Sequence, residues 1–299
     1  MHRVDFRMKN RLVHFFHVQK PLKIFLNNST PIPAKQRIMT LSHLKRRQPI
    51  MTTGQGHLMI KTALHAGRIM IENGSEVARV EDTIHRIAIN AGYPDSKVYV
   101  TITGMMMSIS GEENAQIEPV ASRSIDLEKI TQVNDLSRQF AAGTIDLPQF
   151  EQQLTALEAH PRYFPFWLQL ISAGLVSGTL EVVFRHNLPD FGITCLIGLV
   201  GWAIFYGVNR VARVRFLSEF LAAVGIGALA IWFVNLHLGN SVDDIIIGSV
   251  MPLVPGVPLT NAVRDILAGD LVSGIARGIE ALMSAIAIGS GIAMILQVL

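Results

Sequence analysis

The feature that most constrains this chain is a series of five apolar stretches, each about 20 residues long, that begins after residue 161. A helix of that length crosses a hydrocarbon core of about 30 Å. The stretches cover about residues 164–184, 191–208, 216–238, 242–259 and 272–296. Only 16% of the chain is charged, against about 25% in soluble domains. We therefore predict an α-helical polytopic membrane protein with about five transmembrane helices in residues 161–299.

The start of the chain has a different character. Residues 1–50 carry eleven Lys or Arg and a single acidic residue, Asp5. Their apolar runs are shorter than the 7–15 residues that a signal peptide needs, and no sustained periodicity is present. We predict that residues 1–56 form a basic, disordered leader whose basic side chains could contact anionic lipid.

Residues 57–160 show regular periodicity and an acidic balance, with eight basic and fourteen acidic residues between residues 51 and 160. Helical spacing of apolar residues is followed by short strand patterns with glycine at the turns, and then by helical spacing again. The predicted helices cover about 57–73, 75–92, 127–141 and 147–159, and the predicted strands 98–102, 105–109 and 117–120. We expect Ser75 to cap the second helix. The pattern predicts a small α+β domain, which we place in the cytoplasm.

The titratable residues of this segment raise the question of an enzyme. Glu81 and His85 are four residues apart and share a helix face, which is half of a metal site. However, the chain contains no HExxH, no GxSxG and no P-loop motif. Ordinary solvated helix faces with i,i+4 pairs explain these residues more simply. We expect no enzymatic activity, no metal site and no cofactor.

The fourth apolar stretch is interrupted by three prolines and a glycine within residues 252–258. Proline removes a backbone donor and clashes with the preceding turn, so we expect no regular helix there. Discontinuous helices of this kind bind substrates and ions in secondary transporters. The candidate substrate- or ion-binding residues are Pro252, Pro255, Gly256, Pro258, Asn261, Arg264, Asp265, Asp270, Arg277 and Glu219.

Charged residues within apolar stretches are candidates for function because their insertion costs about 2.5–3.5 kcal/mol. Glu219 lies in the third stretch, and Arg277 and Glu280 are three residues apart on one helix face, where they could pair. Glu181 lies near the end of the first stretch, where it could reach the interface. An ion-coupling carboxylate is expected among Glu219, Asp265 and Asp270.

The connections between the apolar stretches indicate orientation. Arg210, Arg213 and Arg215 lie between the second and third stretches, whereas Asp243 and Asp244 lie between the third and fourth. Because basic loops stay in the cytoplasm, we predict that the α+β domain is cytoplasmic and that the C-terminus lies outside.

Two stretches of the sequence resemble the threonine/serine exporter (ThrE) family. One is GSEVARVEDTIHRIA at residues 74–88, and the other is PLVPGVPLTNAVRDILAGD at 252–270, followed by SGIAR at 273–277. The resemblance covers about residues 57–297 and implies a transporter of the cytoplasmic membrane. Long members of the family have about ten spans. A chain of five is similar to the larger, YjjP-type chain of split bacterial exporters, which works with a small, separately encoded membrane protein of the YjjB type.

The resemblance implies export of threonine and serine, or of a dicarboxylate such as succinate. A zwitterion needs an acceptor such as Asp265 or Asp270 for its ammonium and donors such as Asn261 and Arg264 for its carboxylate. A dicarboxylate needs more donors, and Arg264 together with Arg277 would supply them. Because no ATP-binding loop is present, we expect proton-coupled secondary transport. The alternative functions are a membrane-tethered sensor and a membrane enzyme that uses the neighbourhood of Glu81. The alternative assembly is a homo-oligomer. Nucleic acid is not an expected partner.

Overall fold

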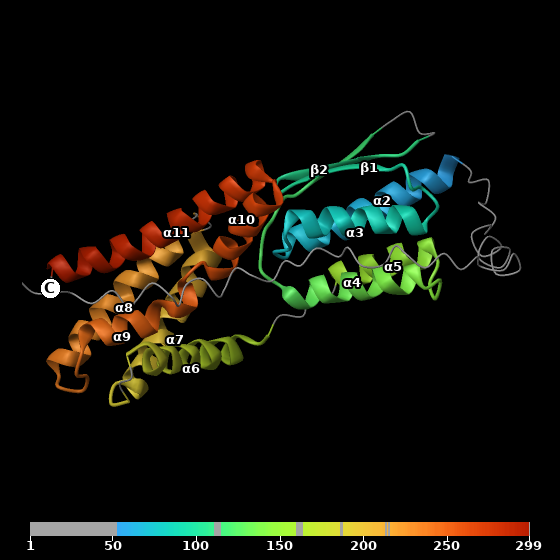
Figure 1. The fold of residues 1–299 in the computed structure, drawn as a ribbon. Coiled ribbons are helices and arrows are strands. Elements are labelled where there is room, and N and C mark those ends of the chain that lie inside the picture. Colours follow the sequence, from blue (N-terminus) through green and yellow to red (C-terminus); the bar gives the residue numbers. More distant parts are fainter. Residues whose placement is uncertain are drawn as a thin grey trace, which may run out of the picture. The chain divides into compact units, whose positions relative to one another are not determined.

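The computed structural model describes residues 53–110, 115–159, 164–185, 188–212, 214 and 216–298. Almost all of the predicted leader lies outside these residues, as do Arg213 and Arg215, on which the predicted orientation partly rests. The described part of the chain is mostly helical, with one small sheet (Figure 1). Within it we distinguish an α/β region, residues 53–159, and a helical bundle, residues 166–298.

The α/β region has three layers: a sheet, the helix pair α2–α3, and the helix pair α4–α5 (Figure 1). The three strands are antiparallel in the order β1-β2-β3, with Val100 opposite Met105 and Met106 opposite Ile117. Along the strands, Val100 and Met105 are buried while Met106 and Ile117 are exposed, as expected for a sheet covered on one face. The elements are α2 (Thr53–Glu72), α3 (Val77–Asn90), β1 (Lys97–Thr101), β2 (Gly104–Ser108), β3 (Gln116–Pro119), α4 (Leu127–Ala141) and α5 (Leu147–Ala159).

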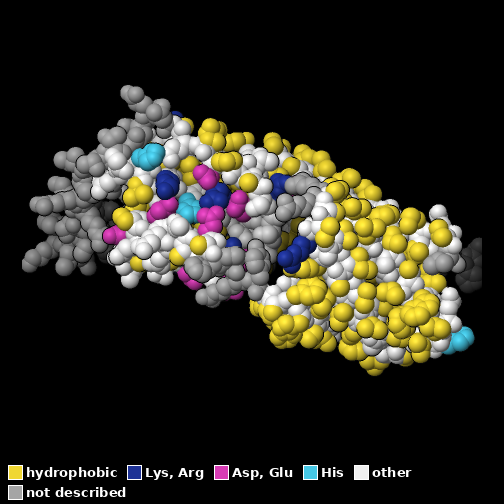
Figure 2. Space-filling view, turned by 180° about the vertical axis from the view of Figure 1, so that it is seen from behind, with side chains coloured by type: hydrophobic (Ala, Val, Ile, Leu, Met, Phe, Trp, Pro, Cys, Tyr) yellow, Lys and Arg dark blue, Asp and Glu magenta, His cyan; other side chains and the backbone are white. Residues whose placement is uncertain are grey.

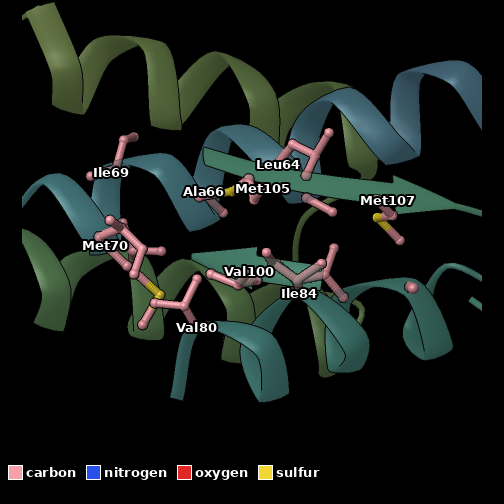
Figure 3. Close-up of a cluster of buried hydrophobic side chains, with 14 of the residues drawn as sticks. Leu64, Ala66, Ile69, Met70, Val80, Ile84, Val100, Met105 and Met107 are labelled. Carbon is pink, nitrogen blue, oxygen red and sulfur yellow. The ribbon is translucent and has the colours of Figure 1, made fainter. Parts of the chain in front are cut away.

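The core of the α/β region lies where α2 and α3 pack against the sheet. Val80 and Ile84 are four residues apart on one face of α3, and they meet Met70 of α2 and Met105 of β2 (Figure 3). At Gly67, an added Cβ would lie 2.5 Å from Cδ1 of Ile84. The absence of a side chain at Gly67 therefore allows the close approach of α2 to α3.

The bundle contains four helices long and apolar enough to span a membrane, and a bent pair that could form a fifth span. The four are α6 (Phe166–Arg185), α7 (Phe191–Ala212), α8 (Leu217–Asn235) and α11 (Leu271–Val298), and the bent pair is α9 (Val242–Val250) with the short helix η1 (Met251–Leu253) and α10 (Gly256–Ala268). One face of the bundle is covered by hydrophobic side chains, whereas charged side chains gather over the α/β region (Figure 2). These helices form a polytopic helical membrane protein, as the sequence predicts.

The break in the fourth span is shorter than we predicted. The two parts of the span meet at 61°, and Val254 between them is extended (φ −64°, ψ 128°). However, α10 already begins at Gly256, so the expectation of no helix up to Pro258 is wrong. Pro258 is tolerated because the first turn of a helix leaves its N–H groups without partners inside the helix. Asn261, Arg264 and Asp265 therefore lie on a helix rather than on an irregular segment.

Candidate functional site

The first site-forming contact joins Asp265 of α10 to the start of α3. The backbone N–H of Val77 donates a hydrogen bond of 2.9 Å to Oδ1 of Asp265, and this carboxylate is completely buried. Our expectation that Ser75 caps α3 is wrong, because the N-cap position is Glu76 and its side chain makes no capping bond. A helix N-terminus has unpaired donors and a partial positive charge, so it stabilises a carboxylate there. A residue 188 positions away thus supplies the cap.

Arg277 and Asn261 bind the backbone immediately before α3. Nη2 of Arg277 donates to the carbonyl of Ser75 at 2.7 Å, while its Nε lies 3.4 Å from Oδ2 of Asp265. Nδ2 of Asn261 donates to the carbonyl of Gly74, also at 2.7 Å. We call this set of contacts between residues 74–77 and α10–α11 the joint. Because all three side chains of the joint are buried, it forms a fixed connection between the α/β region and the bundle.

Arg264 and Asp270 lie at the edge of the joint. Nη1 of Arg264 is 2.7 Å from Oε1 of Glu76, and 63% of the Arg264 side chain is exposed. Asp270, in the turn between α10 and α11, faces Glu81 on α3. Burial raises the pKa of Glu81, the nearby Asp270 raises it further, and His85 opposes the rise.

Glu81 and His85, around which the alternative of an enzyme was considered, do not form a metal site with other described residues. His85 pairs with Ser96, its Nδ1 lying 3.0 Å from Oγ. His65 instead lies between Glu151 and Glu158 of α5, at 3.2 and 3.0 Å. No group of three or more His, Cys, Asp or Glu side chains in the described part of the chain could hold a metal ion.

A cavity of about 610 Å³ adjoins the joint. It lies between α7, α8, α10, α11 and the segment before α4. Five of the ten candidate residues line it: Glu219, Pro255, Pro258, Asn261 and Arg277. Pro252 and Gly256 are not among its lining residues; Pro252 lies in η1, and Gly256 is exposed at the start of α10. Arg264 and Asp270 line two other, smaller pockets beside α3.

Residues that we did not choose from the sequence complete the lining. Nη2 of Arg123 lies 2.6 Å from Oε1 of Glu280, and Nε of Arg277 lies 3.4 Å from Oδ2 of Asp265. Trp202 lines the cavity, and its indole N–H is buried without a hydrogen-bond partner among the described residues. Glu219 accepts a hydrogen bond of 2.8 Å from Oγ of Ser218.

These lining residues differ in how visible they are in the sequence. Arg123 lies in a segment without secondary structure, and Trp202 lies within an apolar stretch, so neither stands out without the fold. Glu280 is visible in the sequence as a charge within the last apolar stretch, but the sequence does not show which residue pairs with it.

The profile of the threonine/serine exporter (ThrE) family matches residues 61–299. The chain belongs to this family. Members of the ThrE family are transporters and not enzymes. The chain is therefore a multi-pass membrane protein that functions in transport. The two stretches that carry the resemblance in the sequence, 74–88 and 252–270, are the same two that meet in the joint, through Val77 with Asp265 and Gly74 with Asn261.

Individual relatives are distant and differ in length. A probable threonine/serine exporter of Mycobacterium tuberculosis is 22% identical over 247 residues, which is 80% of this chain and 46% of the relative. The chain thus spans less than half of that ThrE protein. A probable succinate transporter subunit, YjjP of Escherichia coli, is 21% identical over 253 residues, covering 83% of this chain and 97% of YjjP. The Klebsiella aerogenes YjjP is 22% identical over 243 residues, covering 79% and 91%. No solved structure matches.

Proposed function

We propose that this chain is the larger subunit of a proton-coupled secondary transporter that exports a small polar metabolite across the cytoplasmic membrane. The observation that carries the proposal is the cavity at the broken span, whose lining holds fixed charges of both signs. Discontinuous helices with polar linings are the usual binding sites of secondary transporters. The α/β region is the cytoplasmic domain in this proposal, and the joint connects it to the cavity.

A zwitterionic amino acid of the threonine or serine type fits this lining. Arg123 and Arg277 are balanced by Glu219 and Glu280, and the indole N–H of Trp202 adds an unused donor. Glu219 would accept the ammonium group of the substrate, while the arginines and Trp202 would donate to its carboxylate. A buried site that pairs each substrate charge avoids the desolvation penalty of an unpaired one.

Export of a dicarboxylate is the second candidate, favoured by the two YjjP relatives, whose names specify succinate. A dicarboxylate calls for two strong donors, and we expected Arg264 and Arg277 to supply them. Arg264, however, lines a separate pocket beside Glu76 rather than this cavity. With two glutamates facing the substrate, the lining suits a dianion less well than a zwitterion.

The joint gives a route by which substrate could control the α/β region. Asn261 and Arg277 both line the cavity and donate to carbonyls just before α3. A substrate carboxylate that drew the guanidinium of Arg277 toward the cavity would weaken its bond to Ser75. Differential binding of this kind is what shifts a conformational equilibrium.

The lengths of the relatives support a partner chain. This chain matches nearly the whole of one relative, itself named a subunit, and less than half of another. We propose that a small membrane protein of the YjjB type supplies the remaining spans. A homo-oligomer is the alternative assembly.

Efflux from preloaded cells lacking their own exporters tests the function. Threonine and succinate efflux would be compared for this chain alone, a small membrane protein of the YjjB type alone, and both together. We expect threonine efflux only with both chains. Succinate efflux instead would select the second candidate. No efflux of either, with both chains shown in the membrane, would contradict the proposal.

Two variants connect that efflux to the cavity. Trp202→Phe removes the unused donor and keeps an aromatic ring, so we expect threonine efflux to fall several-fold. Trp232→Phe is the matched control, because Trp232 lies in the same bundle but is 56% exposed and outside the cavity. Equal efflux by the two variants would remove Trp202 from the site.

A further inference from the structure

A second carboxylate, Glu181, is buried in the bundle away from the cavity. It lies on α6, one helical turn before that helix ends at Arg185, and its residue exposure is 0%. Its position in the sequence left two alternatives open, a functional charge inside the span or a side chain that reaches the interface, and its burial excludes the second. Neither carboxylate oxygen has a hydrogen-bond partner among the residues that the structure describes. A buried carboxylate without partners is costly enough that it indicates a function.

Glu181 is enclosed by α7 and α9. At Gly248 of α9, an added Cβ would lie 2.7 Å from Cβ of Glu181, 2.6 Å from Cγ2 of Thr194 and 2.9 Å from the carbonyl of Ser177. The hydroxyl of Thr194 faces Glu181 but is also buried without a partner in hydrogen-bonding geometry in the described part of the chain. Glu181 and Thr194 therefore flank one glycine, at a contact too close for any side chain.

Among the side chains that the structure describes, the ionisable groups that face Glu181 do not neutralise it. They are Asp190, which directly precedes α7, Cys195 on α7, and Asp244 on α9. Asp190 is already used, because its carboxylate accepts bonds of 2.9–3.1 Å from Asn240 and Ser241. No basic side chain among the described residues forms an ion pair with Glu181. Ionisation of Glu181 would place a negative charge near acidic neighbours in a buried environment, where charges interact more strongly than in water.

We propose that Glu181 is the proton-binding site that couples transport to the proton gradient, and that the packing of α6, α7 and α9 in this structure holds it in the neutral form. This inference rests on the proposed function and replaces Glu219, Asp265 and Asp270 as the expected coupling residues. Of those three, Asp265 is held by Val77 and Arg277, and Glu219 faces the substrate cavity.

The position of Glu181 connects proton binding to the broken span. Gly248 lies three residues before the short helix that begins at Met251, where the span bends. Loss of the proton would place a charge against α9, and this charge would favour a packing in which α6 and α9 separate and water enters. In the proposed orientation this end of the bundle faces outside, so an external proton would restore the present packing.

The test uses proteoliposomes that contain this chain together with its partner. Two rates are measured for wild type and Glu181→Gln: accumulation of threonine driven by a pH gradient, and exchange of labelled for unlabelled threonine without a gradient. We expect the Gln variant, which mimics the protonated form, to lose gradient-driven accumulation at least tenfold and to keep exchange within about twofold. Asp243→Asn, an exposed carboxylate on α9, is the matched control and should behave as wild type.

A second measurement needs no substrate and separates the two proposals. Below the ordinary carboxyl pKa of about 4.3, Glu181 is protonated in both folded and unfolded protein. As the pH rises, the unfolded chain ionises while the packed carboxyl must keep its proton, so stability falls. The melting temperature of wild type should therefore drop relative to Glu181→Gln between pH 5 and pH 8, whereas Glu181→Asp should retain the drop.

The outcomes are distinguishable. A Gln variant with normal gradient-driven accumulation, or with the same pH dependence of melting as wild type, would overturn the assignment of Glu181. If wild type transports neither threonine nor succinate, the proposed function fails, and the melting experiment still decides whether Glu181 binds a proton.

Discussion

The two ends of the broken span each bury a carboxylate completely, but they treat it differently. At the α10 end, Oδ1 of Asp265 accepts the N–H of Val77, and Oδ2, which has no hydrogen bond among the described residues, lies 3.4 Å from Nε of Arg277. At the α9 end, Glu181 has no partner in the described residues and faces acidic neighbours. The first carboxylate is held by contacts that need its charge, and the second is packed in a way that opposes charge. The comparison teaches that similar burial can serve a fixed connection at one end and a titratable switch at the other.

Removing the held carboxylate should have the largest effect on stability. Asp265→Ala leaves Arg277 buried without its ion partner and the N–H of Val77 without an acceptor. We expect a loss of about 3–5 kcal/mol, the usual result of breaking a buried pair. Unfolding of the purified protein in detergent, followed by tryptophan fluorescence, measures it.

A double variant controls for general damage at this position. Asp265→Ala with Arg277→Met removes both charges, so we expect it to be more stable than Asp265→Ala alone, since apolar replacement of a buried pair is often neutral. Wild-type stability in the single variant would show that the joint does not hold the bundle and the α/β region together.

The packing around Glu181 can be disturbed without touching its charge. Gly248→Ala places a Cβ within 2.6–2.9 Å of atoms of Thr194, Glu181 and Ser177. Overpacking of this kind costs about 1–3 kcal/mol. Gly207→Ala is the control, since Gly207 has open space around it in another helix of the bundle, and alanine there should be neutral or stabilising. Equal effects would mean that α6 and α9 are not closely packed at this point.

Much of the fold could be predicted because its signals are local. The boundaries of α4 and α5 are those predicted, since capping residues and apolar periodicity act within a few residues. The break in the fourth span was found from its prolines, but its extent was overestimated, because Pro258 is harmful inside a helix and harmless in its first turn.

The site was less predictable because its contacts span long distances in the sequence. Asn261, Asp265 and Arg277 stood out in the sequence as polar residues after the break, yet their partners at residues 74–77 lie 187 to 202 positions away. The type of a buried side chain shows that it needs a partner, but it does not show which residue that partner is. Glu181 was named as a charge within an apolar stretch, but its position near a helix end is also typical of an exposed residue, and only the packing of α9 over it reveals burial.

A third carboxylate, in the α/β region, should respond to pH in the opposite direction from Glu181. Glu158 forms a two-bond pair with Arg68 at 2.8 and 3.0 Å. The hydrogen bond from Arg68 lowers the pKa of Glu158, burial opposes this effect, and His65 adds to it. A lowered folded-state pKa gives stability that is present above the unfolded pKa of about 4.3 and is lost as the pH falls through the folded value.

Glu158→Gln should remove that pH dependence. Because Glu158 is partly exposed, solvent screening limits the expected loss at pH 7 to about 0.5–1 kcal/mol. Denaturant unfolding of the full chain at pH 7 and pH 4 measures it. A variant that loses stability on acidification as steeply as wild type would show that other carboxylates set the acid response.

The smallest effect is expected for Arg264→Ala, and it tests whether burial rather than charge gives the joint its strength. Arg264 and Arg277 both bind the start of α3, at the same distance of 2.7 Å. They differ in exposure, because the Arg264 side chain is 63% exposed and that of Arg277 only 8%. An exposed ion pair contributes about 0.2–1 kcal/mol, so Arg264→Ala should change the unfolding free energy by a few tenths, and Arg277→Ala by several times more. Equal losses for the two variants would show that the charge facing residues 74–77, and not its removal from water, holds the two regions together. In that case burial would no longer explain how Asp265 and Arg277 hold the joint.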